Sequence, residues 1–116
     1  MAETETHLEV RRPSETTAII AVRGELTGAT EAALMDAYGR ASDAVTRGIV
    51  LDFSELEYMN STGIGLLVTL LVRAQRHRQK LMAFGLSEHY RQILSLTRLD
   101  EAIGVVESEE DALRAG

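Results

Sequence analysis

The sequence has 116 residues, a formal net charge of −6 and no cysteine. A chain of this length can form one domain around a single hydrophobic core. The missing cysteine excludes disulfides, thiolate zinc sites and cysteine nucleophiles. The negative charge disfavours nucleic acid as a partner, because phosphate binding depends on clustered Lys and Arg side chains.

The start of the chain and its apolar segments predict a cytoplasmic domain without a membrane span. Residues 1–7 lack the basic start and apolar stretch of a secretory signal. The longest apolar stretch, residues 64–72, is much shorter than the roughly 20 residues that cross a bilayer. We therefore expect a flexible N-terminus over residues 1–7, one domain over residues 8–116, and no membrane partner.

The first half of the chain alternates strand and helix patterns. Strands are predicted over residues 8–12, 16–22 and 48–53, a helix over residues 29–45 and a connecting loop over residues 54–58. Gly24 marks the end of the second strand. The third strand is almost unbroken in its apolar character, as expected of a central strand covered on both faces. Asp52, near its carboxyl end, is interpreted as a carboxylate that braces the following loop.

The second half continues the alternation. A helix is predicted over residues 61–77, a strand over 81–86, a helix opened by Ser87 that carries Leu99 inward, a strand over 103–106 and a last helix from Ser108. Alternating elements of this kind indicate an α/β domain with one mixed sheet. A sheet of about four to five strands is expected.

The joint between the loop and the helix over 61–77 reads Asn60-Ser61-Thr62-Gly63. Asn60 and Ser61 are both favourable N-cap residues, and Gly63 allows a close approach of the backbone. Asn60 alone could cap the helix, which leaves the hydroxyls of Ser61 and Thr62 spare. A helix N-terminus accepts an anion well, so a phosphate on Ser61 would change the surface without unfolding the helix.

Other chemistries fit the residues less well. The run around Ser61 is not G-x-S-x-G, and His7, His77 and His89 are interpreted as solvated surface residues, with His7 in a frayed N-terminus. The glycines at 63 and 65 lack both the G-x-G-x-x-G spacing and a phosphate-binding lysine. No metal-ligand motif is present, and we expect no catalytic residue, metal or cofactor.

One basic cluster follows the helix over 61–77. Its members are Arg73, Arg76, His77, Arg78 and Lys80. Two interpretations stay open, a solvated helix face and a docking patch for a partner.

Three runs, GELTGAT, IVLDFSELEYMNSTGIGLL and LMAFGLSEHYRQILSLTRLDEAI, resemble the bacterial anti-sigma factor antagonists, which are single STAS domains. The resemblance covers about residues 8–113 and implies a small mixed sheet with helices mainly on one face. It also implies a non-enzymatic partner switch. The unphosphorylated protein would bind an anti-sigma factor serine/threonine kinase and free the sigma factor. Phosphorylation of Ser61 would end binding, and a PP2C-type phosphatase would reverse it.

The resemblance implies a partner-binding surface of Thr27, Asn60, Ser61, Thr62, Gly63 and Ile64. The family usually has acidic residues at the positions of Thr27 and Asn60, so we hypothesise that this neutral pair tunes recognition of a cognate kinase. Thr62 is a possible second phosphoacceptor. Two alternatives keep the STAS fold: an assembly subunit of a transport complex that is never phosphorylated, and a switch with an output other than a sigma factor.

Overall fold

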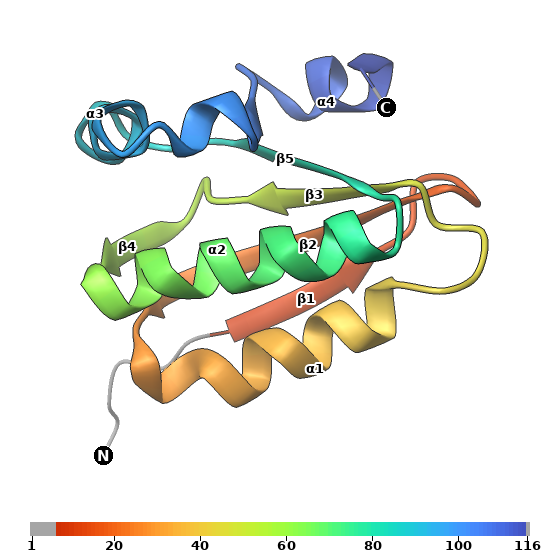
Figure 1. Ribbon diagram of the computed structural model, residues 1–116, viewed down its shortest axis with the longest axis horizontal. Coiled ribbons are helices and arrows are strands. Elements are labelled where there is room, and N and C mark those ends of the chain that lie inside the picture. Colours follow the sequence, from red (N-terminus) through yellow and green to blue (C-terminus); the bar gives the residue numbers. More distant parts are fainter. Residues whose placement is uncertain (1–6, 116) are drawn as a thin grey trace.

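A six-stranded mixed sheet is the centre of the computed structural model, which describes residues 7–115 (Figure 1). The strands are β1 (His7–Arg11), β2 (Thr17–Leu26), β3 (Gly48–Asp52), β4 (Leu56–Met59), β5 (Lys80–Phe84) and β6 (Gly104–Val105). They lie in the order β1-β2-β3-β5-β6, and β4 pairs with the end of β2. β1 is antiparallel to β2, and the other pairs are parallel. The mixed α/β fold predicted from the sequence is confirmed.

Three α-helices and two short 3₁₀ helices lie between the strands in the chain, and a fourth α-helix follows the last strand. They are η1 (Gly28–Thr30), α1 (Glu31–Ala41), α2 (Ser61–Arg76), α3 (Glu88–Leu96), η2 (Leu99–Glu101) and α4 (Glu109–Ala115). α1 and α2 lie side by side across one face of the sheet (Figure 1). Among the described residues, no helix is both long enough and apolar enough to span a bilayer.

The two faces of the sheet carry separate apolar clusters, because successive strand residues point to opposite sides. In β2, Ile20 and Val22 pack with side chains of α1, α2 and α3 in the larger cluster. Ile19 faces the other way and joins Val50, Met82, Phe84 and Ala112, the last from α4. Three helices therefore cover one face and the short α4 covers part of the other.

The sequence prediction differs from the structure at β4. Residues 54–58 were expected to be a loop, yet residues 56–59 form a strand parallel to the end of β2. β2 also continues to Leu26 instead of ending at Gly24, because Gly24 forms a bulge there. Its φ is 90°, its N–H donates to the Glu55 carbonyl oxygen at 3.1 Å, and the register shifts between Gly24 and Glu25.

Two predicted helices end earlier than expected. α1 stops at Ala41 rather than residue 45, because the Asp43 carboxylate accepts hydrogen bonds from the backbone N–H groups of Val45 and Thr46 and forms a turn. α3 ends at Leu96, where Arg98 adopts a left-handed φ of 63°. Leu99 is partly buried against the core, as predicted, but in η2.

Candidate functional site

The predicted site lies at the end of the sheet where β2 and β4 finish and α2 begins (Figure 1). Leu26 ends β2 beside Met59, the last residue of β4. The Leu26 carbonyl oxygen accepts a hydrogen bond from the N–H of Asn60 at 3.3 Å. The end of β2 thus fixes the position at which the chain turns into α2.

Asn60 caps α2, as the sequence predicted. Its backbone is extended, and its side-chain oxygen accepts a hydrogen bond from the N–H of Gly63 at 2.9 Å. Ser61 and Thr62 are exposed, and neither hydroxyl makes a hydrogen bond with any part of residues 7–115. The two hydroxyls therefore have no capping role in the fold.

The first turn of α2 also offers free backbone donors. The N–H groups of Ser61 and Thr62 precede the first intrahelical bond, which the N–H of Ile64 makes to the Asn60 carbonyl oxygen at 3.0 Å. No acidic side chain belongs to this turn. Unpaired N–H groups and the positive end of the helix dipole favour an anion at Ser61.

Gly63 is required by the close approach of α2 to β2. A Cβ atom at this position would overlap the Leu26 carbonyl oxygen and lie 3.0 Å from Cγ of Met59. Gly65, by contrast, has no atom within 4 Å of the place where a Cβ would be. Of the two glycines in this turn, only Gly63 occupies a position that has no room for a side chain. Ile64 is partly buried against the core.

Thr27 caps the neighbouring turn, η1. Its hydroxyl oxygen accepts from the N–H of Ala29 at 3.2 Å, while Oγ1 of Thr30 accepts from the N–H of Thr27 at 3.0 Å. A Cβ at Gly28 would lie 3.2 Å from the methyl group of Thr62. The β2–η1 turn and the start of α2 therefore touch, which brings the segment that holds Thr27 beside the Ser61-Thr62 pair.

Tyr90 supports the site, a role that the sequence analysis missed. Its hydroxyl oxygen accepts a hydrogen bond from the N–H of Met59 at 2.9 Å, so α3 is joined to the last residue of β4. Tyr58, the preceding β4 residue, leaves 48% of its surface exposed next to the joint. The two residues of the Tyr90 bond are 31 positions apart, and no local pattern signals such a contact.

The other residues considered from the sequence lie apart from this chemistry. Asp52 braces its loop as predicted, because Oδ1 accepts from the N–H and the hydroxyl of Ser54 at 2.9 and 2.6 Å. His7 was expected in a frayed terminus but opens β1 opposite Arg23, and its side chain is exposed. Within residues 7–115, no group of three or more His, Cys, Asp or Glu side chains could hold a metal ion.

Comparison with known proteins agrees with this architecture. The family model described as "Mlab, STAS domain" matches residues 9–107. An anti-sigma-B factor antagonist of Listeria monocytogenes is 35% identical over 63 residues, which are 53% of this chain and 55% of that protein. The chain thus spans about half the length of the curated relatives it matches.

Two solved structures share the fold over almost the whole chain. An anti-sigma factor antagonist from Mycobacterium paratuberculosis has a TM-score of 0.82 at 23% identity, covering 98% of this chain and 96% of that one. The cell fate determinant SpoIIAA of Bacillus, in its phosphorylated form, has a TM-score of 0.67 at 18% identity, covering 94% and 98%.

Proposed function

The chain belongs to the STAS domain family, and from this premise we propose that it is an anti-sigma factor antagonist that acts by partner switching. In this proposal the unphosphorylated protein binds an anti-sigma factor serine/threonine kinase, and phosphorylation of Ser61 ends the complex. A PP2C-type phosphatase restores the binding form. The protein is a cytoplasmic binding partner and catalyses no reaction itself.

The observation that supports the proposal most directly is that Asn60 and Ser61 have different roles. Asn60 supplies the helix cap, so the exposed Ser61 hydroxyl is free to react. A phosphate there would lie at the N-terminus of a 16-residue helix, beside free backbone N–H groups. The modification would therefore leave the fold intact.

The phosphate would weaken binding of the partner. About two negative charges would appear on a surface where a docked kinase contacts a neutral hydroxyl, and an unpaired charge is costly to bury in an interface. The solved phosphorylated form of SpoIIAA supports the proposal, because it is a protein of this fold that is phosphorylated. The curated relatives named as anti-sigma-B factor antagonists support the same type of partner.

A pull-down from the native host tests the proposal with tagged wild-type, Ser61→Ala, Ser61→Glu and Thr62→Ala proteins. We expect wild type, Ser61→Ala and Thr62→Ala to recover a protein with an ATP-binding kinase domain, and Ser61→Glu to lose it. Incubation of the recovered kinase with wild type and ATP, followed by mass spectrometry, should place the phosphate on Ser61. A phosphate on Thr62 instead would contradict the assignment.

The same experiment separates the two alternatives. If all four baits recover the same subunits of a transport complex, the protein is an assembly subunit and Ser61 has no switching role. If the kinase is recovered but its other bound protein is not a sigma factor, the switch has a different output.

A further inference from the structure

Seven of the arginine side chains form ion pairs with carboxylates of the same chain. Within residues 7–115, these arginines are Arg11, Arg12, Arg23, Arg40, Arg91, Arg98 and Arg114. The chain has 12 Lys and Arg residues in total. The remaining five have no carboxylate partner in the described residues: Arg47, Arg73, Arg76, Arg78 and Lys80. In a protein with an excess of acidic residues, five cations without a carboxylate partner among residues 7–115 are unexpected.

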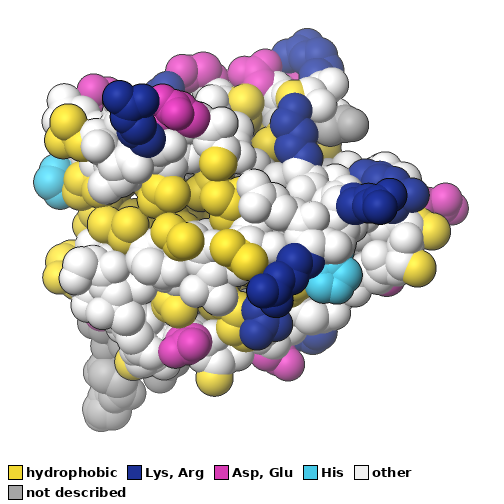
Figure 2. Space-filling view, in the orientation of Figure 1, with side chains coloured by type: hydrophobic (Ala, Val, Ile, Leu, Met, Phe, Trp, Pro, Cys, Tyr) yellow, Lys and Arg dark blue, Asp and Glu magenta, His cyan; other side chains and the backbone are white. Residues whose placement is uncertain are grey.

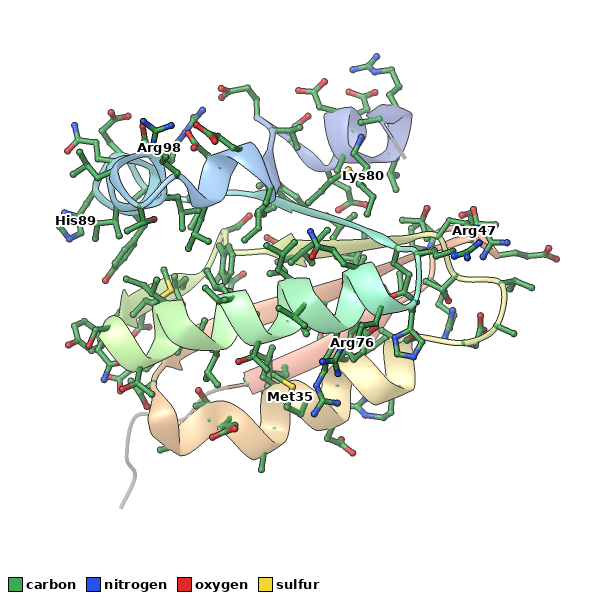
Figure 3. All side chains as sticks on the ribbon, in the orientation of Figure 1. Met35, Arg47, Arg76, Lys80, His89 and Arg98 are labelled. Atoms are coloured by element: carbon green, nitrogen blue, oxygen red, sulfur yellow. The ribbon has the colours of Figure 1, made fainter. Side chains whose placement is uncertain are left out.

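These five residues, called the basic end below, gather where α2 finishes and where β3 and β5 begin. Arg73 and Arg76 belong to the last turn of α2, and Lys80 is the first residue of β5. The N–H of Lys80 donates to the Arg47 carbonyl oxygen at 2.8 Å, which joins the two loops. In Figure 3, Arg47 lies at this end of the domain, Lys80 points toward α4 and Arg76 lies between α2 and α1, and the dark blue surface in Figure 2 forms separate patches.

Fold stability accounts for only part of the basic end. Arg73 and Arg76 complement the negative end of the α2 dipole. Lys80 donates from Nζ to the carbonyl oxygen of Ala115, the last residue of α4, at 3.4 Å. Arg47 is outside any helix, and Arg78 adopts a left-handed φ of 59°, where glycine is the favourable residue after a helix. The chain therefore retains exposed cations at two positions, Arg47 and Arg78, where helix capping does not require them.

The surroundings of the basic end favour an acidic polypeptide over other anions. Val72 precedes Arg73 in the sequence and is 40% exposed, and Val45 lies two residues before Arg47 and is 52% exposed. Both valines offer apolar contacts to side chains of a peptide. Both Phe residues and Tyr38 are buried, while Tyr58 and Tyr90 belong to the Ser61 site. The basic end thus lacks the exposed aromatic rings that stack on bases or anchor a protein at a membrane interface.

We propose that the basic end docks an acidic segment of a partner protein in which carboxylates alternate with aliphatic residues. Four of its five cations are arginines, whose planar guanidinium groups pair with carboxylates through two parallel hydrogen bonds. Arg11 already pairs with Glu109 in this way, because its two terminal nitrogens donate to separate carboxylate oxygens at 3.3 and 3.0 Å. The six other paired arginines also contact carboxylates of this chain.

This surface is independent of the proposed switch. α2 has 16 residues and is therefore about 24 Å long, with Ser61 at its first position and Arg76 at its last. This separation exceeds the Debye length of roughly 10 Å at 0.1 M salt, so a charge on Ser61 is screened at the basic end. One partner could stay bound to the basic end while the Ser61 end exchanges another.

The test measures binding of a fluorescent peptide of alternating Glu and Val to the full chain by anisotropy, with a Gln-Val peptide as reference. We expect the Glu-Val peptide to bind in a salt-dependent manner and the Gln-Val peptide not to bind. The triple variant Arg47→Gln, Arg76→Gln, Lys80→Gln should raise the dissociation constant at least about tenfold. Ser61→Glu should leave it within about twofold of wild type.

A matched control removes three charges elsewhere. Arg23→Gln, Arg91→Gln, Arg98→Gln changes the net charge equally at exposed sites and should leave the dissociation constant within about twofold. Absence of wild-type binding, or equal weakening by both triple variants, would overturn the proposal. It would also be overturned if vesicles with anionic phosphatidylglycerol, or duplex DNA, bound more tightly than the peptide and lost binding with the basic-end variant.

Discussion

The side-chain oxygen of Asn60 accepts a hydrogen bond from the N–H of Gly63, so the exposed Ser61 is not needed as the N-cap of α2. We predict that Asn60→Ala lowers the free energy of unfolding by about 1 kcal/mol, because the helix loses its N-cap. Ser61→Ala should change it by less than about 0.5 kcal/mol, the range of ordinary surface substitutions. Urea unfolding of both variants measures the difference. Equal destabilisation by the two would show that Ser61 also caps the helix.

The two glycines of α2 should respond differently to the same substitution. Gly63→Ala places a methyl group on the Leu26 carbonyl oxygen, and we expect a loss of at least about 2 kcal/mol in the free energy of unfolding. Gly65→Ala enters open space and should stabilise the helix by up to about 1 kcal/mol. Thermal and urea unfolding provide the comparison. A well-folded Gly63→Ala protein of unchanged stability would contradict the close packing at Leu26.

Tyr90 is expected to hold the β4–α2 joint in place. Tyr90→Phe removes the acceptor of the Met59 N–H and should cost about 1 kcal/mol in stability. The specific readout is hydrogen exchange by NMR, in which the Met59 amide should exchange faster than in wild type. Tyr58→Phe is the control, since the exposed Tyr58 makes no such bond among residues 7–115. Unchanged protection of Met59 in Tyr90→Phe would exclude this role.

The sequence predicts most elements because their burial patterns are local, whereas the missed features depend on distant contacts. β3 is apolar on both faces and its neighbours have clear periodicity, so their type follows from a few adjacent residues. β4 has one buried residue, Met59, and it forms because β2 extends past the Gly24 bulge to pair with it. Likewise, Asn60 was predictable as a cap from adjacent residues, whereas the contacts of Tyr90 with Met59 and of Gly28 with Thr62 depend on the tertiary fold.

The turn after α1 predicts a pH dependence. Hydrogen bonds from the Thr46 hydroxyl, and then from the backbone N–H of Val45, lower the pKa of Asp43 below its ordinary value of 3.8. A depressed pKa means that the carboxylate stabilises the fold above the unfolded-state pKa and that this contribution disappears as pH falls through the folded-state pKa. NMR titration should show the pKa of Asp43 rising toward 3.8 in Thr46→Val. A pKa that does not rise in the variant would show that the Thr46 hydroxyl is not the main cause of the shift.

The neutral residues beside Ser61 provide the sharpest test of kinase recognition. Thr27 and Asn60 both act as N-caps, and Asp is as good an N-cap as either, so Thr27→Asp with Asn60→Asp should keep the fold. The change adds two negative charges to the proposed partner-facing surface, which should weaken binding of the cognate kinase by about tenfold. Calorimetry with the kinase recovered by wild type measures this, and Asp36→Asn with Glu101→Gln serves as a control that alters exposed charges elsewhere. An unchanged dissociation constant for the double aspartate variant would show that the neutral pair does not tune recognition, even if Ser61 is the phosphorylated residue.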